Sequence, residues 1–104
     1  MVLYILKWNV FPDKVEAYKE WSKTGHLRCL AVPGVVEFRG YRPATGASQV
    51  VTTYEFADLA AWAAWYVHED VQKVMGELRT LTTNVITELW NPSPAVPQPI
   101  RPEK

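Results

Sequence analysis

Residues 32–56 read VPGVVEFRGYRPATGASQVVTTYEF, and this stretch decides the fold class. Two runs rich in β-branched and aromatic residues, 35–42 and 49–56, are typical of strands. Between them, residues 43–48 have the Pro, Gly and Ser composition of a hairpin loop. The Pro-Gly pair at 33–34 ends the helix expected before it. The stretch therefore predicts an antiparallel hairpin that directly follows a helix.

The segments on either side of this hairpin complete an order of strands and helices. Residues 2–9, VLYILKWN, predict a buried strand, and the helical spacing of residues 15–29 predicts a first helix. Asp58 is the expected N-cap of a second helix, which residues 68–70 interrupt before the helical period resumes. Residues 84–90, NVITELW, predict the last strand.

This order of strand, helix, strand, strand, helix, strand predicts an α+β protein. It is the ferredoxin-like βαββαβ arrangement, with an antiparallel four-stranded sheet. We expect this domain to cover residues 1–91. Residues 92–104 hold five of the eight prolines, so we expect them to form an extended tail.

Both faces of the expected sheet carry apolar side chains. The first strand, for example, alternates Tyr4 and Trp8 with Leu3 and Ile5. Two helices cover only one face, and an antiparallel sheet with one wet face should alternate cleanly between apolar and polar residues. We therefore expect the other face to pack on the same face of a second copy, which gives a homodimer. The alternative is a sheet with scattered surface aromatics.

Composition excludes several classes of protein. The chain of 104 residues is one domain, and its 11 basic and 11 acidic residues argue against a nucleic-acid partner. No apolar run approaches the about 20 residues that cross a membrane, and the first residues do not resemble a signal peptide. The single cysteine, Cys29, cannot form an internal disulfide, which favours a cytoplasmic location. The glycine-rich signatures of nucleotide-binding loops are absent from the sequence.

Two local patterns carry a resemblance to a known superfamily. LAVPG at 30–34 leads into VVEFRGYR, and WYVHEDV at 65–71 is followed by ELRTL at 77–81. With the order of elements, these patterns resemble the dimeric α+β barrel superfamily, in which two ferredoxin-like subunits pair sheet to sheet. The similar branches are the antibiotic-biosynthesis-monooxygenase-like group and the stress-responsive A/B barrel group. His68 matches the first histidine of the stress-responsive pattern, and Val71 replaces the second.

The resemblance implies a function as well as a fold. It points to a small-molecule enzyme similar to the cofactor-independent monooxygenases, which act on aromatic or polyketide-like compounds. The alternative is a non-catalytic dimer of the stress-responsive type, which binds a hydrophobic ligand or another protein. An isomerase similar to the muconolactone type shares this architecture and is a third alternative.

Another branch of the superfamily binds and degrades haem. The resemblance implies that three residues would bind and degrade haem: an Asn at the end of the first strand, a Trp in the second helix and a later His. Asn9 and Trp65 (or Tyr66) match the first two positions. The His position falls on Met75 or Gly76, and neither side chain replaces an imidazole ligand. We therefore expect the protein to work without a cofactor.

An aromatic stripe and a strand-end amide are the first candidate site residues. Trp62, Trp65 and Tyr66 are spaced to share one face of a helix. They either line a slot for a flat aromatic ligand or fill the core. Asn9 either holds a substrate oxygen or caps the turn before Pro12. In the monooxygenase hypothesis Asn9 and Trp65 are catalytic, and Trp62 and Tyr66 bind the ligand.

The two histidines are the remaining candidates. Imidazole groups exchange protons near neutral pH, so we expect His68 to be catalytic and His26 to contribute to the ligand site. The alternative for His68 is a solvated residue at a helix break. His68, Glu69 and Asp70 are consecutive and point apart on a helix, so we expect no metal site.

Overall fold

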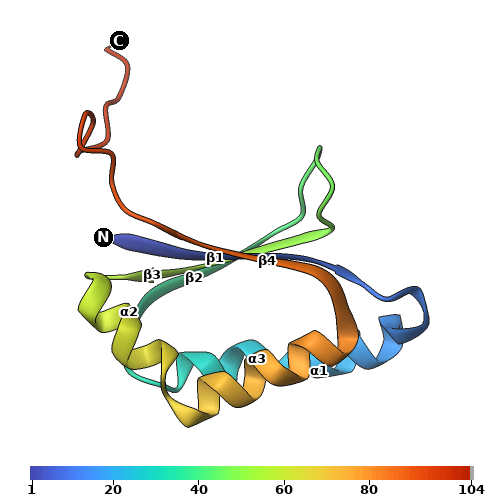
Figure 1. Cartoon of the computed structure of the whole chain (residues 1–104). Coiled ribbons are helices and arrows are strands. Elements are labelled where there is room, and N and C mark those ends of the chain that lie inside the picture. Colours follow the sequence, from blue (N-terminus) through green and yellow to red (C-terminus); the bar gives the residue numbers. More distant parts are fainter. Residues whose placement is uncertain (104) are drawn as a thin grey trace.

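The structure of the chain is a computed structural model that describes residues 1–103. Along these residues the elements are β1 (Val2–Val10), the 3-10 helix η1 (Pro12–Lys14), α1 (Val15–Leu30), β2 (Val35–Tyr41), β3 (Val50–Phe56), α2 (Leu59–Tyr66), α3 (Glu69–Leu81) and β4 (Thr82–Trp90). The strands form one antiparallel sheet in the order β2-β3-β1-β4 (Figure 1). The predicted ferredoxin-like α+β fold is confirmed.

The helices α1, α2 and α3 all lie on one side of the sheet, and the other side is open (Figure 1). Alternate residues of a strand point to opposite faces, so every second residue of β1 meets the helices. Tyr4, Leu6 and Trp8 are the largest of these side chains, and each is at most 5% exposed. The core therefore lies between the two central strands and the helices, and this chain leaves the open face uncovered.

Trp65 of α2 is the centre of this core. Its side chain is 0% exposed, and its ring lies 5.0 Å from the rings of both Tyr54 and Phe56. The indole Nε1–H donates a hydrogen bond to the carbonyl oxygen of Cys29 at 3.0 Å. This bond satisfies the one polar atom of the side chain and ties α2 to the end of α1.

Two strands are longer than the sequence predicts. β4 begins at Thr82 rather than Asn84, because the buried Thr82 hydroxyl donates to the carbonyl of Leu78 at 2.7 Å and lets α3 run directly into the strand. β1 continues to Val10, whose N–H donates to the side chain of Gln49 at 2.9 Å. Both extensions depend on contacts between elements, which local sequence patterns do not contain.

An ion pair joins α1 to α3. Arg28 donates to both carboxylate oxygens of Glu77, at 2.6 and 2.9 Å, and the indole N–H of Trp21 donates to the same carboxylate at 3.0 Å. The hydrogen-bonded guanidinium of Arg28 lowers the pKa of Glu77. Trp21 is thereby held against Gly25, where an added Cβ would lie 2.8 Å from the indole ring.

We expect Gly25→Ala to lower the free energy of unfolding by about 1–3 kcal/mol, because the methyl group collides with a ring that Glu77 holds in place. Gly76→Ala on α3 is the matched control. Nothing lies within 4 Å of a Cβ added at Gly76, so better helix propensity should stabilise that variant by up to about 1 kcal/mol. Urea denaturation of both variants measures the difference. If both variants changed the free energy of unfolding in the same direction, the close approach of the Trp21 ring to Gly25 would be contradicted.

After β4 the chain forms the tail, residues 91–103, which contains no helix or strand. The tail leaves the sheet on the side of the open face and rises away from the helices (Figure 1). Its side chains are exposed, and it makes a turn in which the N–H of Val96 donates to the carbonyl of Ser93 at 3.2 Å. Of the helices in residues 1–103, none is both long and apolar enough to cross a membrane.

Candidate functional site

A hollow of about 250 Å³ opens between α2 and the side of the sheet formed by β1 and β4. We call it the α2 hollow. Its lining is aromatic and hydroxyl-bearing for the most part, and consists of Tyr4, Trp62, Tyr66, Thr87, Glu88 and Leu89. Sites for drug-sized ligands measure about 300–1,000 Å³, so this space suits a compound of a few rings at most.

Aromatic rings from two elements build the wall of the α2 hollow. Trp62 and Tyr66 lie four residues apart on α2 and share a face, with ring centroids 5.1 Å apart and planes that differ by 20°. Tyr4 of β1 lies 5.7 Å from each of these rings and meets Tyr66 edge-on. These are favourable aromatic geometries, so the wall is held in place before any ligand arrives.

The phenol of Tyr4 is a hydrogen-bond donor at this site. Burial and, after it, the neighbouring phenol of Tyr66 raise the pKa of Tyr4 to about 12, while a hydrogen bond with Thr87 and the positive charge of Arg79 act in the opposite direction. Tyr4 therefore keeps its proton at neutral pH and can donate a hydrogen bond to an anionic oxygen. Its place on the helix-facing side of β1 follows from the strand's alternation, but the sequence assigned it no functional role.

The indole N–H of Trp62 is a second donor, and it has no acceptor. Within residues 1–103, Trp62 Nε1 is the one buried side-chain nitrogen or oxygen that lacks a hydrogen-bond partner. Leaving a buried donor unsatisfied costs about 1–3 kcal/mol. Proteins keep such groups rarely, and Trp62 is also one of the residues that line the α2 hollow.

The space between α1, α3 and the sheet is nearly filled. A cavity of about 10 Å³ is left beneath His26, with Trp8, Trp21 and Tyr54 among its lining residues. This volume holds one water molecule at most. His26 itself packs between Trp21 and Phe38, at centroid distances of 5.7 and 4.9 Å, and burial lowers its pKa. No aromatic ligand fits there without movement of these rings.

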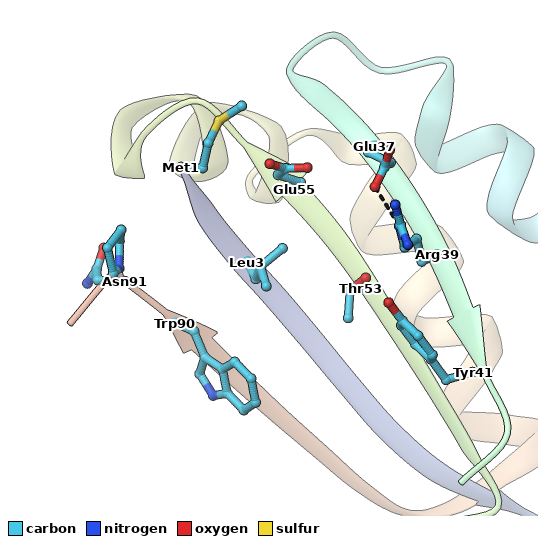
Figure 2. A pocket seen from close by; sticks show the side chains of 10 residues that line it. Met1, Leu3, Glu37, Arg39, Tyr41, Thr53, Glu55, Trp90 and Asn91 are labelled. Atoms are coloured by element: carbon cyan, nitrogen blue, oxygen red, sulfur yellow. Dashed lines mark hydrogen bonds and ion pairs between the residues drawn. The ribbon is translucent and has the colours of Figure 1, made fainter. Parts of the chain in front are cut away.

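A larger hollow, of about 430 Å³, lies on the open face (Figure 2). Its lining includes an ion pair in which Arg39 Nε donates to Glu37 at 2.6 Å, with Glu55 on the neighbouring strand. A small aromatic compound placed there would meet charged side chains rather than a stacked wall. The α2 hollow is therefore the better site for a planar, weakly polar ligand.

Comparison with protein families identifies the chain. The model of the antibiotic biosynthesis monooxygenase family matches residues 1–77, which include β1, the hairpin and α2. The chain belongs to the antibiotic biosynthesis monooxygenase family. The resemblance inferred from the sequence is thereby confirmed. Among curated proteins, none matches this chain.

Solved structures share the fold of this monooxygenase family member at low sequence identity. SnoaB, a cofactor-independent oxygenase from Streptomyces nogalater, is 15% identical with a TM-score of 0.72, and the match covers 93% of this chain and 97% of SnoaB. A protein from Arabidopsis thaliana is 13% identical with a TM-score of 0.78, covering 89% and 96% of the two chains. A protein from Mycobacterium tuberculosis is 17% identical with a TM-score of 0.72, covering 88% and 94%. These likenesses establish the common architecture.

The aromatic stripe that the sequence predicts on α2 is divided between two places in the structure, the α2 hollow and the core. Trp62 and Tyr66 line the α2 hollow. Trp65, predicted to be catalytic, lies in the core with 0% exposure and is not among the residues that line the hollow. Successive helical positions point about 100° apart, because an α-helix has 3.6 residues per turn. One stripe therefore supplies both core and site.

Asn9 lies near the other end of β1 from Tyr4. Strand residues rise by about 3.3 Å each, which places the two residues about 16 Å apart. The side-chain oxygen of Asn9 accepts a hydrogen bond from the N–H of Gln49 at 2.7 Å, and thereby fixes the start of β3 to the end of β1. The structure therefore gives Asn9 a structural partner and does not bring it to the α2 hollow.

His68 caps a helix. The interruption predicted at residues 68–70 separates α2 from α3, and His68 Nδ1 accepts a hydrogen bond from the N–H of Asp70 at 3.1 Å. Neither His68 nor His26 lines the α2 hollow. Their catalytic and ligand-binding roles stay predictions, and this hollow has no histidine in its lining.

The residues present do not fit haem. The expected ligand position falls on Met75, which is 6% exposed in the core, and on Gly76, which has no side chain to offer. In the described part of the chain, residues 1–103, no three His, Cys, Asp or Glu side chains lie together in a way that could hold a metal ion.

Proposed function

We propose that this chain is a small-molecule enzyme of the cofactor-independent monooxygenase kind, which oxidises a phenol or enol bound in the α2 hollow. The observation that carries the proposal is the buried, unpartnered N–H of Trp62. Together with the O–H of Tyr4 it offers two donors beside an aromatic wall. A planar compound whose oxygen becomes negatively charged supplies the acceptor that Trp62 lacks and a further acceptor for Tyr4.

Binding in the α2 hollow favours the ionised form of such a compound. Hydrogen bonds from fixed donors to a developing oxyanion are strong in a partly desolvated site, and they lower the pKa of the bound phenol or enol. The hollow opens to solvent, so the proton leaves to water. Glu88 does not take it, because its carboxylate lies near Lys7 at 3.6 Å and accepts from Trp90 Nε1 at 3.1 Å.

The reaction then needs only the substrate and O₂. The substrate anion passes one electron to O₂, and the resulting carbon radical and superoxide combine to form a peroxide at a ring CH₂ carbon. The peroxide takes up a proton and loses water, which leaves a ketone. One oxygen atom enters the product, and the other leaves in water with the two hydrogens of the CH₂ group. The protein contributes orientation and stabilisation of the anion.

We further propose that the protein works without a cofactor, forms a homodimer and lies in the cytoplasm. SnoaB is described as a cofactor-independent oxygenase, and this supports chemistry without a cofactor here. The uncovered sheet face, with Tyr41, Ile86 and Trp90 at 46–51% exposure, supports a homodimer formed sheet to sheet. The buried thiol of Cys29 suits a reducing cytoplasm.

Calorimetric titration with anthrone, a three-ring compound with one CH₂ group, tests the site in oxygen-free buffer. We expect saturable micromolar binding, weakened about tenfold or more in Trp62→Phe, which keeps a ring and removes the N–H donor. Tyr41→Phe, on the open face, is the control and should bind as the wild type does. Equal affinity of all three proteins, or no binding by any, would contradict the assignment.

A non-catalytic binding module is the second candidate. The α2 hollow contains no histidine, and its one carboxylate is engaged elsewhere, so the hollow has no obvious general base. A binding module would take up the ligand and leave it unchanged in the presence of O₂. Binding without oxygen consumption therefore separates this function from the enzyme.

A further inference from the structure

Aromatic rings lead from the α2 hollow into the centre of the core. Trp62 at the hollow and Trp65 in the core lie three residues apart on α2, and Tyr4 contacts both rings, at centroid distances of 5.7 and 6.0 Å. Trp65 in turn lies 5.0 Å from the ring of Tyr54 on β3. The aromatic wall of the hollow is therefore continuous with the aromatic core.

The same run of rings continues from Tyr54 to Trp21 on α1. Both side chains border the cavity of about 10 Å³ beneath His26, which holds one water molecule at most, so they face each other across a small space. A second route passes over Phe38, whose ring lies 4.8 Å from Tyr54 and 4.9 Å from His26. The ring of His26 lies 5.7 Å from Trp21. Aromatic rings thus connect the α2 hollow to α1.

Trp21 has a polar partner that the other indoles of this run lack. It is half-buried, and its N–H donates to the carboxylate of Glu77 at 3.0 Å. The hydrogen bonds from Arg28 lower the pKa of Glu77, so this carboxylate is ionised at neutral pH. An indole that has lost an electron is a stronger donor, and a charge-assisted hydrogen bond stabilises it. Trp65 donates to a backbone carbonyl and Trp62 has no acceptor, so a missing electron is most stable on Trp21.

We propose that Trp62, Trp65 and Trp21 form an electron relay between α1 and the α2 hollow, with Tyr4 and Tyr54 as the rings between them. Burial raises the pKa of both tyrosines and so disfavours loss of their protons. An oxidised phenol is stable only after it loses its proton, so electrons cross the tyrosine rings and the missing electron rests on the indoles. The use of the relay in the cell rests on the proposed function, but the relay itself requires only these side chains.

The relay removes a radical that has lost its reaction partner. When superoxide leaves the hollow early, the substrate's carbon radical combines with a second O₂ and becomes a peroxyl radical. The peroxyl radical takes one electron from Trp62 and one proton from water, which gives a hydroperoxide. Trp65 returns an electron to Trp62, and Trp21 returns one to Trp65. A thiol in solution then reduces Trp21 and loses its proton to water, and two of the resulting thiyl radicals join as a disulfide.

A light-driven oxidant fixed at the α2 hollow tests the relay on the full chain without any substrate. A ruthenium–bipyridine photosensitiser is attached through Glu88→Cys, because Glu88 lines the hollow and the native Cys29 is buried. Every sample also carries Trp90→Phe, since Trp90 donates to Glu88 and would compete as the electron donor. Methyl viologen accepts the electron from the excited ruthenium, and the oxidised ruthenium then takes one from the protein. Superoxide dismutase and catalase remove oxidants that diffuse.

Peptide mass spectrometry after illumination in air should find oxidation mainly at Trp21, although the sensitiser lies at the hollow. Trp65→Phe interrupts the relay, because a phenyl ring is much harder to oxidise than an indole, and should move most of the oxidation from Trp21 to Trp62. Phe56→Leu is the matched control. Phe56 also lies 5.0 Å from Trp65 but is not part of the relay, so oxidation should stay at Trp21 in this variant.

Two results would overturn the relay: oxidation confined to Trp62 in the parent protein, or oxidation of Trp21 that Trp65→Phe leaves unchanged. Trp21→Phe changes a half-buried residue and is the second variant, used if circular dichroism shows that Trp65→Phe does not fold. It should leave the oxidation on Trp62 and Trp65, and an unchanged total at these two indoles would contradict the relay. None of these results depends on turnover, so failure of the relay and failure of the proposed function are separate outcomes.

Discussion

Replacing Trp65 with alanine is expected to lower the free energy of unfolding by about 3–5 kcal/mol. The side chain is 0% exposed and lies among the rings of Tyr54 and Phe56. Its removal leaves a large cavity and also leaves the Cys29 carbonyl without its indole donor. Domains have only about 5–15 kcal/mol of stability, so the variant should be close to unfolding at physiological temperature.

Chemical denaturation of Trp65→Ala, Trp65→Phe and Leu27→Ala measures this effect. Trp65→Phe keeps most of the ring volume and should lose clearly less than Trp65→Ala. Leu27 is 61% exposed on α1, so Leu27→Ala should change the free energy by no more than about 0.5 kcal/mol. A loss below about 1 kcal/mol in Trp65→Ala would mean that Trp65 is not a core residue.

Replacing Tyr4 with phenylalanine is expected to lower kcat for oxidation of a phenol or enol about 100-fold, with a smaller change in KM. Loss of one preorganised donor to an oxyanion costs about 10²–10³ in rate, because that donor stabilises charge that develops in the transition state. The pKa of Tyr4, about 12, keeps the donor protonated at every pH at which the enzyme would be assayed.

Tyr18→Phe is the matched control for Tyr4→Phe. The Tyr18 oxygen accepts a hydrogen bond from Trp8 Nε1 at 3.2 Å and does not line the α2 hollow, so this variant should retain its rate. Steady-state oxygen consumption by the two variants and the wild type measures the effect. If Tyr4→Phe and Tyr18→Phe lose equal activity, the loss comes from packing, and Tyr4 has no role as a donor.

Most of the fold could be predicted from the sequence because its signals are local. The Pro-Gly pair at 33–34, the composition of the hairpin loop and the N-cap at Asp58 each act within a few residues of the chain. Asp58 does accept from the N–H of Ala61 at 2.8 Å, as an N-cap should. The start of β4 was missed because Thr82 is held by Leu78 through a side-chain bond that strand propensity does not contain.

The candidate site could be predicted only in part, for a related reason. The helical spacing of Trp62 and Tyr66 follows from the sequence, but their partner Tyr4 comes from a distant strand. Asn9 and His68 have side chains that suit catalysis and also satisfy backbone N–H groups, and in the structure both make backbone hydrogen bonds. Residue type alone does not distinguish these uses.

Oxygen consumption with anthrone, in buffer treated to remove metal ions, is the most direct test of the proposed function. The α2 hollow should bind the enol form and yield the corresponding quinone, with one O₂ consumed for each product molecule and a rate that falls in both Trp62→Phe and Tyr4→Phe. Binding of anthrone with no oxygen uptake above the protein-free rate would contradict the enzyme and leave a binding module in its place.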